Sequence, residues 1–145
     1  MTKKKNISAK EALTRLREGN QRFTSDLRSL ESLLSHTRRS ELADGQTPFA
    51  VILGCSDSRV PAETVFDQGL GDLFVIRVAG NIVAPSQVGS IEFAAEHFGT
   101  RLVIVLGHSH CGAVNATIDH LENPGPSASV GLQSIVDRVR PSVET

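Results

Sequence analysis

The fold is decided by the stretch Phe49-Ala-Val-Ile-Leu-Gly54, which passes directly into Cys55-Ser-Asp-Ser-Arg59. A second apolar run, Leu102-Val-Ile-Val-Leu-Gly107, passes in the same way into His108-Ser-His-Cys111. Short, uninterrupted apolar runs of this kind are typical of strands buried on both faces of a parallel sheet. Because open α/β sheets place their sites at the carboxyl edge, we expect both polar runs to emerge side by side at that edge.

Helical patterns alternate with the apolar runs along the chain. A capping box, Ser8-x-x-Glu11, predicts a first helix that ends near Gly19. The leucines from Leu27 to Leu34 predict a second helix, which runs toward Asp44-Gly45. Strands are expected over 49–54, 73–78 and 102–107, and later helices from Pro61 and over 86–98, 111–121 and 130–139, the last halted by Pro141.

This alternation predicts an α/β fold: a three-layer domain with a central, mainly parallel β-sheet flanked by helices, and an N-terminal helical arm. We expect a single domain over residues 1–145. Its arm is expected at 1–45, the core that carries the site at 46–121, and a loop and last helix at 122–145. The arm must pack either on the domain's own sheet or on a partner subunit.

Composition excludes several classes of protein. A net charge of −1, with 39% hydrophobic and 21% charged residues, gives no reason to expect nucleic acid or a membrane as partner. The sequence has no apolar run long enough to span a bilayer, and it has no secretory signal. A cytoplasmic location is therefore expected. Both cysteines lie in the two polar runs, where metal binding or catalysis is a better explanation than a disulfide. The alternative is two small buried hydrophobic residues beside strand ends.

The two polar runs contain the ligand types that zinc prefers. Thiolates of Cys55 and Cys111 with one imidazole would make three protein ligands and leave one position open, which is the arrangement of catalytic zinc sites. His108 is favoured over His110 as the imidazole ligand, because a spacing of three residues points His108 and Cys111 the same way on a helical turn. Zinc lowers the pKa of its bound water toward neutrality, and the resulting zinc-bound hydroxide suits attack on a small electrophilic carbon.

A carboxylate and a guanidinium alternate in the loop after Cys55. Asp57 can bind the metal as a fourth ligand, or it can accept a hydrogen bond from the metal's water. Arg59 is able to hold the carboxylate in a bidentate pair and turn it away from the metal. The alternative is a surface ion pair that contributes little.

At these residues the chain resembles the β-class carbonic anhydrases, from Leu16-Arg-Glu-Gly-Asn-Gln-Arg-Phe23 to at least Gly112-Ala113. The resemblance implies zinc held by Cys55, His108 and Cys111, with the Asp57–Arg59 pair beside the fourth position. It also implies reversible hydration of carbon dioxide to bicarbonate and a proton. The expected assembly is a homodimer or a higher homo-oligomer with the site at the subunit boundary.

The same resemblance suggests residues of a substrate pocket, much of which comes from the neighbouring subunit in the family. Gln46 matches a glutamine that hydrogen-bonds a substrate oxygen, and Phe93 stands where the family often has tyrosine. Further apolar pocket residues are expected at Phe74, Val78 and Ala79. Ile52 replaces the tryptophan of the bicarbonate-inhibited members, which favours the subgroup whose Asp57 stays paired with Arg59.

Family members continue well past this point, so the family's C-terminal part is expected to be absent from this chain. Two alternatives to carbon dioxide hydration therefore stay open. One is a related zinc hydrolase of carbon disulfide or carbonyl sulfide that uses the same site. The other is a zinc-binding form without catalytic activity.

Overall fold

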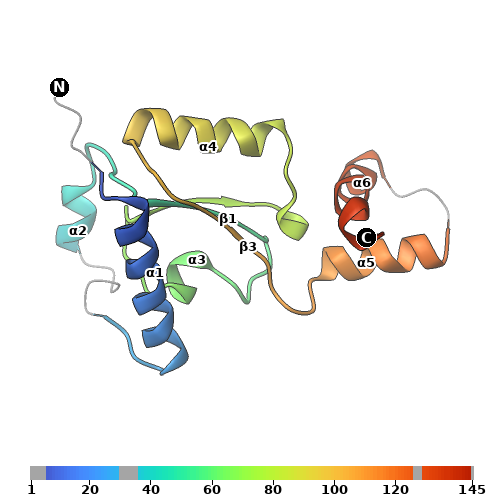
Figure 1. Ribbon diagram of the computed structural model, residues 1–145, viewed down its shortest axis with the longest axis horizontal. Helices are drawn as coiled ribbons and strands as arrows, with labels where there is room; N and C mark the ends of the chain where they lie inside the picture. The colour runs from blue at the N-terminus through green and yellow to red at the C-terminus, as the bar shows by residue number, and fades with distance from the viewer. Residues whose placement is uncertain (1–5, 30–35, 126–128, 145) are drawn as a thin grey trace.

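The computed structural model describes residues 6–29, 36–125 and 129–144, and it contains a parallel three-stranded sheet (Figure 1). The strands are β1 (Ala50–Gly54), β2 (Leu73–Arg77) and β3 (Val103–Leu106), in the order β2-β1-β3. Every residue of β1 is buried because this strand lies in the centre of the sheet. The three expected strands are therefore confirmed, each one or two residues shorter than predicted.

Two helices cover one face of the sheet. Register places Ile52 beside Val75 and Ile104, so these three side chains share a face. Against them pack α1 (Ala9–Thr24) and α3 (Ala62–Val65), shown below the sheet in Figure 1. The buried core here consists of Ala12, Leu16, Phe49, Ala50, Ile52, Ala62 and Leu73. Of the two packing partners left open for the first helix of the arm, the structure shows the domain's own sheet.

The first helix begins at the predicted capping box but ends later than predicted. Ser8 accepts a hydrogen bond from the backbone of Glu11, and the Glu11 carboxylate accepts one from the backbone of Ser8. Gly19 does not end the helix, which continues to Thr24. Gly19 is buried against the Phe66 carbonyl group, where a side chain would collide with backbone, so the glycine permits close packing instead of termination.

The opposite face of the sheet carries α4 (Pro85–Phe98), which makes the third layer (Figure 1). Phe74 of β2 meets two rings of this helix, with centroids 6.1 Å from Phe93 and 5.9 Å from Phe98. The helix starts one residue before the predicted Ser86, because proline is well suited to the first helical position, where its missing N–H is not needed. The predicted three-layer α/β architecture is confirmed.

The remaining helices lie at the ends of the sheet. The short α2 (His36–Glu41) precedes β1 and is the part of the second predicted helix that the structure shows. Residues 27–29, where that helix was expected to begin, are not helical, and residues 30–35 lie outside the described residues. The last helices, α5 (Gly112–Glu122) and α6 (Val130–Val143), pack on each other beyond the carboxyl edge (Figure 1). None of the helices within the described ranges is long and apolar enough to cross a bilayer.

Pro141 does not halt the last helix, contrary to the prediction. It lies inside α6, where it has no N–H to donate to the preceding turn. The backbone after it still forms a helical bond, since the Glu144 N–H donates to the Arg140 carbonyl at 3.0 Å. The loss of one hydrogen bond near the end of the helix is therefore tolerated.

Candidate metal centre

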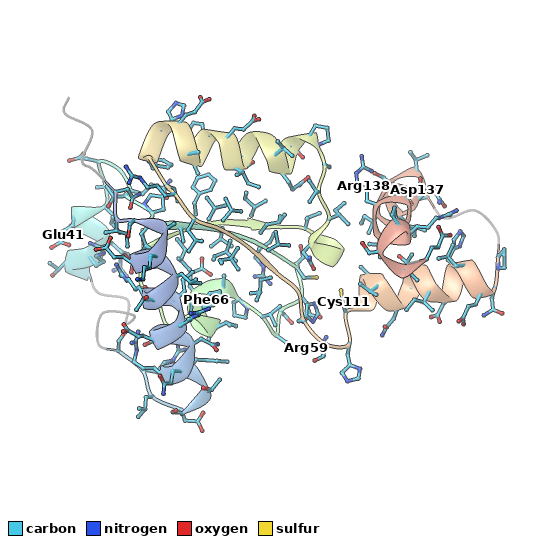
Figure 2. All side chains as sticks on the ribbon, viewed as in Figure 1. Glu41, Arg59, Phe66, Cys111, Asp137 and Arg138 are labelled. Carbon is cyan, nitrogen blue, oxygen red and sulfur yellow. The ribbon has the colours of Figure 1, made fainter. Side chains whose placement is uncertain are left out.

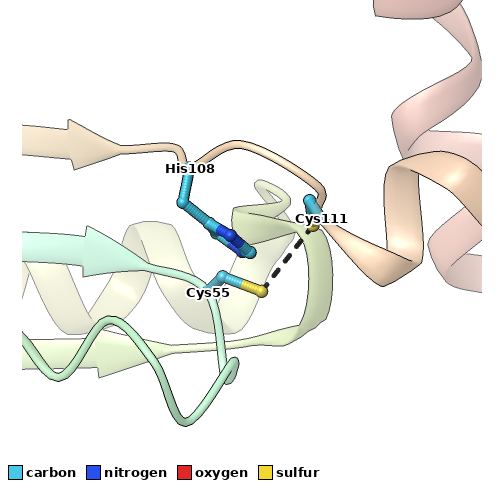
Figure 3. A group of neighbouring side chains, drawn as sticks. All are labelled: Cys55, His108 and Cys111. Carbon is cyan, nitrogen blue, oxygen red and sulfur yellow. Dashed lines mark hydrogen bonds between the residues drawn. The ribbon is translucent and has the colours of Figure 1, made fainter.

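Three side chains converge at the carboxyl edge of the sheet (Figure 3). Cys55 directly follows β1, His108 follows β3, and Cys111 is the residue that caps the start of α5. Their ligand atoms all lie within 4.8 Å of one another, and the two Sγ atoms are 3.9 Å apart. We call these three residues the Cys–His–Cys group. The two polar runs thus meet as the parallel strands predicted.

The imidazole of His108 is oriented toward the sulfur atoms. Its Nδ1 lies 3.0 Å from the carbonyl oxygen of Ser109, so an N–H at this position donates to the backbone. Its Nε2 is buried and has no hydrogen-bond partner among the described residues. A buried polar atom of this kind needs a partner, and metal-bound histidines commonly donate their other ring N–H to a carbonyl group.

This arrangement fits a zinc ion. Two sulfur atoms and one unpartnered imidazole nitrogen form a soft donor set with three protein ligands, as in catalytic zinc sites with one open position. His110, the rival imidazole, has a positive φ of 53°, is exposed and is not a member of the group. The preference for His108 therefore agrees with where the two rings lie.

The surroundings of Cys55 favour the ionised thiol. Burial raises the pKa of Cys55, but the neighbouring His108 imidazole and the backbone N–H groups of Asp57 and Gly80 lower it to about 7. The Gly80 N–H lies 3.4 Å from the Cys55 sulfur. A thiolate is the form that binds metal, so Cys55 is prepared as a ligand near neutral pH.

Asp57 and Arg59 form a bidentate ion pair beside the Cys–His–Cys group. The Arg59 Nε and Nη2 atoms donate to the two Asp57 carboxylate oxygens at 2.9 and 2.7 Å. These hydrogen bonds hold the pKa of Asp57 well below its usual range. The Oδ2 atom of Asp57 lies 3.9 Å from Nε2 of His108, so the negative charge faces the position where a metal would bind.

Arg59 also joins the two loops of the site. Its Nη2 donates to the carbonyl oxygen of His110 at 3.1 Å, across from the loop that carries Cys55. Figure 2 shows Arg59 and Cys111 close together where the sheet leads into α5. One guanidinium thus ties the carboxylate to the backbone of the second loop.

A residue that the sequence analysis missed, Arg77, also holds the first loop. Its Nε donates to the carbonyl oxygen of Cys55 at 2.9 Å, and its Nη2 donates to that of Asp57 at 2.6 Å. Arg77 is the last residue of β2. Arg77 lies near the end of a predicted strand, at the same edge of the sheet as the two motifs, and this position could have identified it as a residue of the site.

The predicted substrate residues fall into two sets. Val78 and Ala79 follow β2 and lie at the site, since the Val78 N–H donates to the Gly54 carbonyl at 3.1 Å and Ala79 precedes the Gly80 that contacts Cys55. Gln46, Phe74 and Phe93 lie elsewhere. The structure therefore brings only the first set to the Cys–His–Cys group of the same chain.

Gln46 lies at the amino edge of the sheet, where it lines an open cavity with Arg39 and Gly71. β1 lies between Gln46 and the site, and its five residues alone span about 16 Å at 3.3 Å per residue. Phe74 pairs with Val51 near the same edge, and Phe93 packs on Phe74. A substrate at Cys55 is thus out of reach of these three side chains within one chain.

Comparisons with known proteins agree with this geometry. A family model described as carbonic anhydrase matches residues 50–145. Carbonic anhydrase 2 of Mycobacterium tuberculosis is 48% identical over 128 residues, which cover 88% of this chain and 61% of that protein. The chain therefore spans about three fifths of the length of this relative.

Solved structures show the same fold. The β-carbonic anhydrase CafA of Aspergillus fumigatus superposes with a TM-score of 0.64 at 29% identity, covering 93% of this chain and 60% of that one. A β-carbonic anhydrase of Sordaria macrospora, described as tetrameric, gives a TM-score of 0.53 at 27% identity over 68% of this chain and 63% of that one.

Proposed function

Since the chain belongs to the carbonic anhydrase family, in its β class, we propose that it binds zinc and catalyses the reversible hydration of carbon dioxide. The observation that carries this proposal is the Cys–His–Cys group, in which the buried Nε2 of His108 lies near two sulfur atoms and has no hydrogen-bond partner in the part of the chain that the structure describes. The donor set, its place at the carboxyl edge and the paired carboxylate beside it all support the proposal.

Cys55, His108 and Cys111 would hold the ion. Bound zinc would supply Lewis acidity, which lowers the pKa of water toward neutrality and makes hydroxide available for attack on carbon. In the hydration direction the water oxygen forms a new C–O bond, one C=O π bond opens with its electron pair moving to oxygen, and one O–H bond of the water breaks, so water and carbon dioxide give bicarbonate and a proton.

Asp57 would orient the attacking oxygen by accepting its hydrogen bond. The carboxylate is ionised at working pH because Arg59 holds its pKa well below the usual range. Arg59 occupies both carboxylate oxygens, which favours this accepting role over permanent metal ligation. Val78 and Ala79 would supply an apolar wall at the same edge.

A homodimer is the assembly that we propose for activity. Gln46, Phe74 and Phe93 cannot reach the Cys–His–Cys group of their own chain, so only a second copy can bring them to a substrate bound there. The described tetramer of the Sordaria macrospora relative supports assembly of this kind. We also propose the cytoplasm as the location, because two thiol ligands 3.9 Å apart are suited to a reducing compartment.

The proposal is tested by measuring metal content and carbon dioxide hydration on one preparation. Mass spectrometry of the purified chain should find zinc at one ion per chain, and stopped-flow assays with a pH indicator should show hydration. Zinc without hydration would refute the catalytic proposal. Faster turnover of carbon disulfide than of carbon dioxide would instead favour the related hydrolase.

A further inference from the structure

We propose that Arg77 is a positioning residue for the metal centre, an inference that rests on the proposed function. Its guanidinium donates to two backbone carbonyl groups, those of Cys55 and Asp57, at 2.9 and 2.6 Å. These are the two residues of the first loop whose side chains would work at the metal. Arg77 does not touch the reacting atoms, and it acts through the backbone of both.

The two contacts fix the orientation of the peptide groups next to the Cys55 and Asp57 side chains. Rotation of a peptide group turns the side chains on either side of it, so the carbonyl orientations at Cys55 and Asp57 set where the thiolate and the carboxylate point. A single planar guanidinium that binds both carbonyls also fixes them relative to each other. The metal ligand and the hydrogen-bond acceptor are thereby held in one geometry.

The support for this guanidinium is rigid. Arg77 ends β2 and pairs in register with Gly54, the last residue of the fully buried central strand. Arg59, itself part of this loop, binds the Asp57 carboxylate and ties it to the His110 carbonyl group of the second loop. The loop is therefore held to β2 through its backbone, by Arg77, and to the second loop through Arg59.

Arginine is required here by the geometry of the contact. Its planar fork presents donors to two acceptors at once, whereas a lysine ammonium is a compact charge that can serve either carbonyl but does not reproduce the fork. The side chain of Arg77 is exposed, so its removal leaves no cavity in the core. We therefore expect a change at Arg77 to affect the metal centre more than the stability of the fold.

The experiment compares Arg77→Gln and Arg77→Lys with the parent chain, and uses Arg17→Gln, at an exposed arginine of α1, as the matched control. Zinc release to a chromogenic chelator is followed in each protein, and kcat and KM for carbon dioxide are measured separately. Changes to groups that orient metal ligands typically cost 10–100-fold in metal affinity or activity, so we expect zinc release to accelerate and kcat to fall by roughly 10–100-fold in Arg77→Gln, with KM little changed.

Rescue distinguishes positioning from a merely structural role. Arg77→Lys should recover part of the loss, and added guanidinium ion should recover part of the kcat of Arg77→Gln while the melting temperature stays that of the parent. Parental zinc release and kcat in Arg77→Gln would overturn the inference. If the parent binds zinc without hydrating carbon dioxide, the proposed function fails, and the zinc-release comparison still decides the role of Arg77.

Discussion

Gln46 and Cys55 lie at opposite ends of β1, one before its amino end and the other directly after its carboxyl end. The strand that positions the cysteine of the Cys–His–Cys group therefore also keeps the glutamine away from it. Each chain presents a Cys–His–Cys group at one edge of the sheet and a set of predicted substrate residues toward the other. Because of this separation, a change at Cys55 and a change at Gln46 affect opposite edges of the same chain.

Removal of one ligand should empty the metal site. Cys55→Ala and Cys111→Ala each leave two of three protein ligands, so zinc should fall from one ion per chain to near zero, and hydration should be lost with it. His110→Ala is the matched control, because that imidazole adjoins Cys111 but lies outside the group. Metal analysis after gel filtration measures the outcome. Zinc retained in Cys111→Ala, or lost in His110→Ala, would contradict the ligand assignment.

Asp57→Asn should separate catalysis from metal binding. The amide keeps the shape of the carboxylate but loses the charge that pairs with Arg59, so we expect kcat to fall by roughly 10–100-fold with zinc content unchanged. Ser58→Ala, at the exposed neighbouring position, is the control. Because the pKa of Asp57 is held well below its usual range, its titration should not shape the pH–rate profile near neutrality. Loss of zinc in Asp57→Asn would identify Asp57 as a ligand.

Much of the site could be predicted from sequence because it depends on local patterns. Buried strands carry continuous apolar runs, and each run led directly to a polar motif, so the meeting of Cys55 with His108 and Cys111 followed from parallel topology alone. The choice of His108 over His110 rested on helical spacing, and the structure agrees with the choice but not with the reason, because both histidines precede α5 and His110 lies in a turn with a positive φ. The three strands could be placed to within two residues because their apolar runs are local patterns of this kind.

The rest depended on contacts between segments far apart in sequence. Glycine is typical of a helix end, but Gly19 lies inside α1, where the absence of a side chain lets the Phe66 backbone approach closely. Arg77 has no motif of its own, and its contacts with the site are to two carbonyl groups 22 and 20 positions away along the chain.

The capping box of α1 should make stability depend on pH in the acid range. Hydrogen bonds from Ser8 lower the pKa of Glu11, so this carboxylate stabilises the fold above its unfolded pKa of about 4.3, and the contribution is lost as the pH falls through the folded value. Urea unfolding of Glu11→Gln should therefore show a deficit near neutrality that disappears in acid. Ser8→Ala should cost about 1 kcal/mol of unfolding free energy. An equal loss of unfolding free energy in Glu11→Gln near neutral pH and in acid would contradict this dependence on pH.

Mixing two inactive chains should restore activity if the site is shared between copies. In a dimer of Cys55→Ala with Gln46→Ala, the second chain supplies an intact Cys–His–Cys group and the first supplies an intact glutamine. One of the two sites in each mixed dimer is then complete, whereas neither parent variant contains a complete site.

Each variant is first assayed alone, and the two are then unfolded together, refolded with zinc and assayed again. We expect carbon dioxide hydration to rise above the sum of the separate activities, with light scattering showing dimers or larger assemblies. A mixture of Cys55→Ala with Asp57→Asn is the control, because both changes fall on the same half of the site and no mixed dimer contains a complete one. Equal activity in the two mixtures would show that Gln46 does not act on the neighbouring chain's metal centre, since complementation requires that the two residues belong to different copies.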